Sequence, residues 1–213
     1  MATTDQKLLQ QIQYAVIEPP DGGQSWPSQL WTRDEVLGLA NQRQDRFLHD
    51  TLLLVGIAIL SPVNIGDHSI ALPADWTRTV SLVWRGNDGI VRELQRVDTF
   101  EADHAIPTWF TTNGVPLFYM EDDVPSSGVV QFGPAPTVAG TLELLYVPLG
   151  TPLNGNGEIL VVPDECAHVI KYAVLADMLS KDGRGRKPAE AEYCEQRVTL
   201  AKQAVDLILE GWA

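Results

Sequence analysis

The last quarter of the chain, residues 159–212, is the part whose fold the sequence constrains most. Pro163 is followed by two acidic residues, a combination that favours the first turn of a helix. An apolar run over residues 166–179 continues that helix, and the glycine- and proline-containing stretch 183–188 interrupts it. Residues 189–209 contain no glycine or proline and are rich in good helix formers. The sequence therefore predicts an antiparallel helical hairpin.

The two predicted helices differ in their apolar patterns. The second has a single narrow apolar stripe at steps of three and four, with charged residues elsewhere, which indicates one buried face. The members of that stripe are Ala191, Cys194, Val198, Ala201, Val205, Ile208 and Trp212. The first helix has two apolar stripes that cover most of its circumference, so we expect it in the middle of a bundle. Both cysteines, Cys166 and Cys194, lie at apolar positions, and we interpret them as packed small hydrophobic residues.

The partners of this hairpin are predicted at the other end of the chain. Residues 6–16 carry an apolar face and are followed by a helix-stopping stretch at 19–23. A second helix begins after Trp31, where Thr32 and Glu35 fit a capping box. These helices are expected to pack against the C-terminal pair.

The fold class predicted from this order is α+β, in one structural unit. Helices from residues 1–50 and 160–213 form a bundle, and residues 51–159 form an inserted, mainly antiparallel β section. Turn signals at 64–67 and 86–89 each lie between two β-forming runs and predict hairpins. The later β-forming runs are 117–120, 129–132 and 141–147, and a short helix is predicted within 97–105. We expect a meander in a small sheet with one covered face.

The net charge of −13 argues against a nucleic-acid-binding surface, because neutralising phosphates needs clustered lysine and arginine. One basic patch exists, formed by Arg184, Arg186 and Lys187 in the loop of the helical hairpin. It is a candidate contact for an acidic partner, and a solvated turn that complements a helix C-terminus is the alternative.

The sequence offers little catalytic chemistry. Four histidines, His49, His68, His104 and His168, are scattered without the spacing of a zinc helix or a catalytic pair. Acidic residues at 101–104 and 121–123 are candidates for a hard cation, but we expect them on a short helix and in a tight turn. There is no phosphate-binding glycine loop and no nucleophile elbow. We therefore predict no catalytic residue, no metal site and no cofactor, and we expect no signal peptide, no membrane span and synthesis in the cytosol.

Aromatic residues are concentrated in the β section. They are Trp76, Trp84, Trp109, Phe110, Phe118 and Tyr119. A sugar-binding platform is one interpretation, and core packing or subunit contact is the commoner one. No strand pattern accounts for Trp109 and Phe110, so this pair is our candidate for exposure at an interface.

Several short motifs occur in a recognisable order along nearly the whole chain. They are WTRDE at 31–35, IALPADW at 70–76 leading into VSLVW at 80–84, VQFGPAP at 130–136, LELLY at 142–146 followed by Pro148, VPDE at 162–165 and EYCEQR at 192–197. In this order the chain resembles the adaptor proteins of the head-to-tail connector in tailed bacteriophages, a group that includes the tail tubular protein A type of short-tailed phages.

This resemblance implies a structural virion protein at the neck of the particle, assembled in the bacterial host cytoplasm. Such adaptors form a dodecameric homo-oligomeric ring on the portal protein after genome packaging and provide the platform for nozzle or tail-tube proteins. Double-stranded DNA passes through the ring without specific binding. An acidic channel lining repels phosphate and permits sliding, and repulsion between acidic subunits favours a monomer until the portal is present.

Three alternatives remain, two from other classes and one, the stopper protein, from the same structural class. A phage carbohydrate-binding or tail accessory module would use the aromatic cluster. A head-completion or stopper protein would also dock at the neck. A metal-dependent hydrolase would need carboxylates that converge on His104 or His168, and no spacing in the sequence predicts this.

Overall fold

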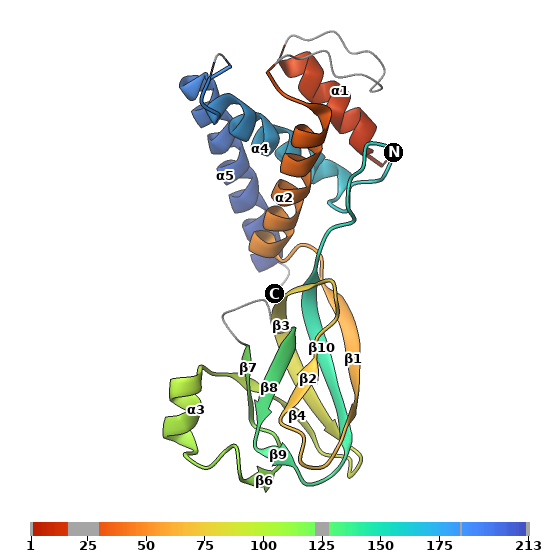
Figure 1. Cartoon of the computed structure of the whole chain (residues 1–213), viewed down its shortest axis with the longest axis vertical. Coiled ribbons are helices and arrows are strands. Elements are labelled where there is room, and N and C mark those ends of the chain that lie inside the picture. Colours follow the sequence, from red (N-terminus) through yellow and green to blue (C-terminus); the bar gives the residue numbers. More distant parts are fainter. Residues whose placement is uncertain (1, 17–29, 122–127, 184, 212–213) are drawn as a thin grey trace. The chain divides into compact units, whose positions relative to one another are not determined.

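A computed structural model of the chain describes residues 2–16, 30–121, 128–183 and 185–211 (Figure 1). Helices lie at both ends of the chain, with mainly antiparallel strands between them, which confirms the predicted α+β class. The chain forms two compact units: a helical unit of residues 1–54 and 149–213, and a β unit of residues 55–148.

The helical unit combines helices from both ends of the chain. They are α1 (Asp5–Ala15), α2 (Arg33–Thr51), α4 (Ala167–Ser180) and α5 (Pro188–Glu210), with a 3-10 turn η1 (Asp164–Cys166) before α4. Helix α4 contacts α1, α2 and α5. Nine of its 14 residues are buried, which confirms the prediction that this helix lies in the middle of a bundle.

The helix ends follow the local chemistry that the sequence predicted, with one difference. The Thr32 hydroxyl accepts a hydrogen bond from the Glu35 amide at 3.2 Å and caps α2. The Glu35 carboxylate does not complete the predicted capping box, because it pairs with the ammonium of Lys181 at the end of α4. This ion pair ties the start of one helix to the end of another.

The described residues of the β unit form ten strands and one helix. They are β1 (Gly56–Val63), β2 (Ser69–Ala71), β3 (Trp76–Gly86), β4 (Val91–Glu93), β5 (Gln95–Arg96), α3 (Thr99–Ala105), β6 (Asn113–Gly114), β7 (Phe118–Glu121), β8 (Val129–Gly133), β9 (Ala135–Pro136) and β10 (Gly140–Pro148). One four-stranded sheet has the order β1-β10-β3-β4, a second has the order β2-β8-β7-β5, and β6 pairs with β9 (Figure 1).

Strand pairing confirms one predicted hairpin and corrects another. Strands β3 and β4 pair antiparallel across the turn at 86–89, as predicted. The turn at 64–67 changes the direction of the chain, but β1 pairs with β10 and β2 pairs with β8, so the hairpin predicted there is wrong. A turn signal reports only local backbone preference, whereas pairing is decided by which strands can bury their apolar faces together.

The predicted meander and single sheet are also wrong. Strand β10 lies between β1 and β3, so the last strand in sequence is central in its sheet. Its inward residues Leu142 and Leu144 are fully buried. They share a core with Val130 and Phe132 from β8 in the second sheet. The β unit therefore consists of two sheets that cover each other's apolar faces.

Candidate partner-binding surfaces

The basic loop between α4 and α5 carries its own counterions. The guanidinium of Arg186 lies 3.0 Å from the Asp182 carboxylate, and the ammonium of Lys187 lies 3.1 Å from that of Glu190. All four side chains are more than half exposed, so these ion pairs contribute little to stability. The carboxylates of a partner can therefore replace those of Asp182 and Glu190 beside the two cations. Arg184, the third predicted residue of this patch, lies outside the described residues.

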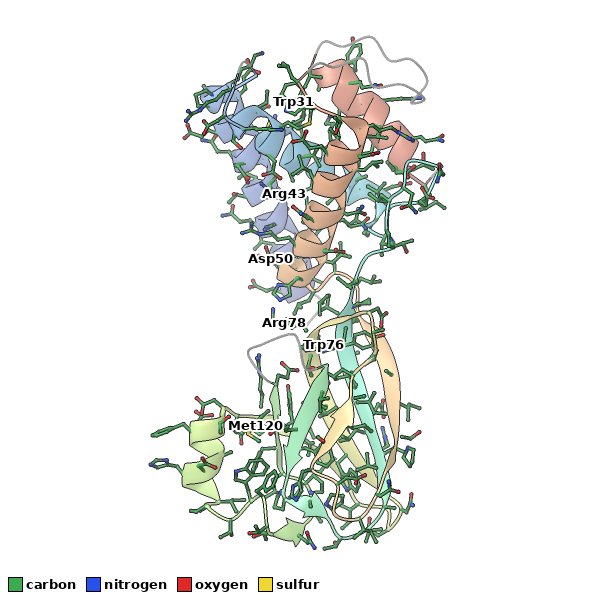
Figure 2. The ribbon with its side chains drawn as sticks, viewed as in Figure 1. Trp31, Arg43, Asp50, Trp76, Arg78 and Met120 are labelled. Carbon is green, nitrogen blue, oxygen red and sulfur yellow. The ribbon has the colours of Figure 1, made fainter. Side chains whose placement is uncertain are left out.

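The same loop packs over Trp31, a residue that the sequence analysis did not select. A Cβ atom at Gly185 would lie 2.7 Å from the Trp31 ring, so only glycine lets the backbone cross the ring this closely. Figure 2 shows Trp31 at the beginning of α2. The loop borders a pocket of about 330 Å³ whose other walls come from the end of α1, the residues just before α2, and helices α4 and α5. It is lined by Ala15, Val16, Leu30, Trp31, Leu175, Leu179, Gly185, Lys187, Glu190, Tyr193 and Cys194.

The two aromatic residues proposed for an interface have different environments. Trp109 is buried, and its indole N–H donates a hydrogen bond to the Asp103 carboxylate at 2.9 Å. It packs edge-to-face on Phe118, with a ring-centroid distance of 5.9 Å. Phe110 is 61% exposed and stacks on the His68 ring at 4.7 Å. The structure thus presents Phe110 on the surface of this chain and uses Trp109 in the core.

Helix α5 has a second apolar stripe that the sequence analysis missed. Four members of the predicted stripe are buried, namely Ala191, Cys194, Val198 and Val205, and Ala201 is half-buried. Ile208 is 60% exposed, and Trp212 lies outside the described residues. The prediction that the rest of the helix is charged is therefore wrong. The additional exposed positions are Tyr193, Arg197, Leu200, Ala204 and Leu207, which follow one another at steps of four, three, four and three. We call this set the α5 seam.

Beside the α5 seam, a shallow hollow of about 420 Å³ opens between α4 and α5. It is lined by His168, Lys171, Tyr172, Arg197, Leu200 and Ala201. The Arg197 guanidinium lies 5.3 Å from the centre of the Tyr193 ring, and its Nε donates to the Tyr193 hydroxyl at 2.9 Å. The Lys171 ammonium lies 4.7 Å from the centre of the Tyr172 ring. Two cations, each held against a tyrosine ring, therefore line the hollow.

The SU10 adaptor protein family matches residues 6–208, which include both structural units. A search among curated proteins finds no match.

The chain belongs to the SU10 adaptor protein family. Membership identifies it as a phage adaptor protein and agrees with the class of protein that the order of motifs indicated. The tail tubular protein A type is a narrower assignment than this family.

Among the residues that the structure describes, no group of three or more histidine, cysteine or acidic residues is arranged to hold a metal ion. The two cysteines are free thiols, and burial raises the pKa of both. None of the helices in the described ranges has the length and apolar character of a bilayer-spanning segment.

Proposed function

We propose that this protein is the head-to-tail adaptor of a tailed phage and that it acts without catalysis. The match of the SU10 adaptor family over residues 6–208 carries the proposal. The match extends through the helical unit and the β unit, so it applies to the whole architecture and not to one shared module. The similarity in motif order to the tail tubular protein A type supports the same role.

In this role, twelve copies form a ring on the portal protein at the neck of the virion, continue the DNA channel and carry the nozzle or tail tube. The net charge of −13 suits a channel that double-stranded DNA must leave freely, because an acidic wall repels phosphate. Ring formation by a chain of this charge is opposed by repulsion between copies. Contact with the portal offsets that repulsion, and the free protein is then a monomer.

The basic loop is the proposed contact with an acidic surface of the portal. Reversing both described charges, with Arg186→Glu and Lys187→Glu, should abolish docking and leave thermal unfolding nearly unchanged, because both side chains are exposed. The matched control is Lys7→Glu with Arg92→Glu, an equal charge change at two exposed residues outside the loop. Docking by the loop variant at the level of the control would dismiss the loop as the contact.

The aromatic residues do not favour the alternative of a glycan-binding module. Trp84, Trp109, Phe118 and Tyr119 are all buried in the β unit. Sugar platforms need aromatic faces that are open to solvent.

The test of the proposed function is electron microscopy of the protein mixed with the portal protein of the same phage, with sedimentation of each alone. We expect rings only on the portal and a monomer in its absence. A protein that stays monomeric and unbound in the mixture would refute the adaptor function. A stable ring without the portal would refute templated assembly only.

A further inference from the structure

The α5 seam has the pattern of a helix that packs against another helix. Apolar residues at alternating steps of four and three form the contact line of paired helices, because this spacing keeps them on one side over several turns. Leu200 and Leu207 in the seam are 59% and 69% exposed, whereas the buried stripe of the same helix already faces the bundle. The seam is thus a second packing face without a cover among the described residues of this chain.

The charges on the two sides of the seam are of opposite sign. On the side facing α4 lie Lys171 and Arg197, and neither forms an ion pair with a described residue. On the other side of α5, a set of exposed acidic residues forms what we call the acidic flank. It consists of Glu192, Glu195, Asp206 and Glu210. Only Glu195 has a cationic partner in the described chain, namely Arg43 of α2.

A chain with net charge −13 therefore keeps two cations along the seam without an ion-pair partner in the described chain, Arg197 in the seam and Lys171 beside it on α4. It also keeps three carboxylates without such a partner on the flank of α5. Apart from the contacts of the two cations with tyrosine rings, these charges have no oppositely charged partner among the described residues, so their ionic contribution to stability is weak and screened. Complementary charges of this kind set the partner and the orientation when two surfaces meet.

We propose that the α5 seam binds the acidic flank of α5 on a second copy of this chain. The contact is head-to-tail: the seam of one copy meets the flank of the next, whose own seam stays open for another copy. Contacts of this type generate a ring when the rotation between neighbouring copies closes, whereas a contact between identical surfaces stops at a dimer. This inference rests on the proposed function, and it names the surfaces through which neighbouring copies meet.

The same charges disfavour a contact between the α5 seams of two copies of the chain. In a parallel pair of identical seams, equivalent residues share a layer, so Arg197 of one copy would face Arg197 of the other. In an antiparallel pair, like flanks lie together, which places cations beside cations and carboxylates beside carboxylates. The head-to-tail contact avoids both arrangements.

A charge-exchange experiment tests the contact. One variant carries Lys171→Glu and Arg197→Glu at the seam, a second carries Glu192→Lys and Asp206→Lys on the flank, and a third combines all four substitutions. Rings on the portal protein of the same phage are counted by electron microscopy. We expect about a tenfold or greater loss of rings from the first two variants, and recovery to near the wild-type count in the third, because only a direct contact restores complementarity.

The controls separate charge from contact. Lys7→Glu with Arg92→Glu, and Glu93→Lys with Glu165→Lys, change the net charge by the same amounts at exposed residues away from both surfaces. Circular dichroism and thermal unfolding show whether each variant retains its fold.

Two outcomes would overturn the inference alone: rings from the seam and flank variants at the level of their controls, or no recovery in the combined variant. If the wild-type protein forms no ring on the portal, the proposed function and this contact fail together.

Discussion

Different kinds of interaction stabilise the interior of the helical unit and the interior of the β unit. In the β unit, strand ladders satisfy the backbone and an apolar core fills the space between the sheets, with Leu82, Phe132 and Leu144 fully buried. In the helical unit, polar side chains of α2 bind a segment from far along the chain. Gln44 donates to the Thr151 carbonyl at 3.2 Å, and its side-chain carbonyl accepts from the Val161 amide at 3.1 Å.

This difference follows from the route of the chain. Residues 149–161 return to the helical unit without forming a strand of a sheet or a helix, so their buried backbone groups need other partners. Asn41 binds both the amide and the carbonyl of Leu153, at 2.7 and 3.1 Å, and Asp45 accepts from the Gly150 amide at 2.8 Å. One face of α2 thus performs for this segment the role that a neighbouring strand performs in a sheet.

The Arg43 side chain adds a charged connection on another side of α2. Its guanidinium pairs with Asp177 of α4 and lies 2.6 Å from the carboxylate of Glu195 of α5. Figure 2 shows Arg43 on α2 in the helical unit. Both carboxylates raise the pKa of Arg43, so the guanidinium stays charged at every accessible pH. A single residue therefore joins three helices from the two ends of the chain.

The largest effect should come from the apolar core of the β unit. Phe132→Ala removes a fully buried ring and leaves a cavity, so the free energy of unfolding should fall by about 3–5 kcal/mol. Chemical denaturation measures this loss. Phe110→Ala is the control, because Phe110 is exposed and its truncation should cost about 0.5 kcal/mol or less. A loss from Phe132→Ala as small as that of the control would contradict the assignment of the core.

A smaller loss should come from the polar contacts of α2. Gln44→Ala leaves the Val161 amide and the Thr151 carbonyl without their side-chain partner, which should cost about 1–3 kcal/mol. Amide hydrogen exchange should become faster at residues 149–161. Gln42→Ala, at an exposed position of the same helix, should leave both measurements unchanged. If Gln44→Ala and Phe132→Ala lowered the free energy of unfolding by equal amounts, the polar contacts of α2 would contribute as much to stability as the apolar core of the β unit, contrary to this prediction.

The sequence predicted the elements better than their connections. The helical hairpin, the start of α2 at Thr32 and the β3-β4 turn each depend on a local signal, and each was predicted correctly. The pairing of β10 with β1 and β3, and the contacts between Gln44 and residues 149–161, join positions far apart in sequence. Polar side-chain contacts to a distant backbone produce no periodic pattern, so no sequence signal marks them.

The candidate surfaces were only partly predictable for a related reason. The basic loop is visible as a cluster of like charges in sequence. The α5 seam was missed because Arg197 and Ala204 interrupt its apolar character, so only the step pattern through Tyr193, Leu200 and Leu207 reveals it. Trp109 and Phe110 are neighbours with no periodic context, and only the fold separates the buried ring from the exposed one.

The smallest effect concerns the pH dependence of the helical unit. Asp5 is fully buried and accepts hydrogen bonds from the amides of Gly155 and Gly157 at 2.6 and 3.0 Å. Burial, together with a hydrogen bond to the Glu158 carboxyl, raises the pKa of Asp5. The same hydrogen bond lowers the pKa of Glu158 to about 2. Of the two carboxyl groups, Asp5 therefore keeps its proton to higher pH than Glu158 does.

The folded state binds this proton more tightly than the unfolded chain, so its contribution to stability is complete below the ordinary pKa of an aspartate. That contribution is lost as the pH rises through the raised pKa of Asp5. The contribution of Glu158 changes only in more acidic solution, as the pH falls through its lowered pKa. Asp5→Asn cannot titrate, and its amide can still donate to Glu158. Urea unfolding of both proteins between about pH 4 and about pH 7 should therefore show a decline for the wild type that is weaker in the variant. If the free energy of unfolding changed with pH in the same way for both proteins, Asp5 would be ionised throughout this pH range. The polar contacts around Asp5 would then not depend on pH between these limits.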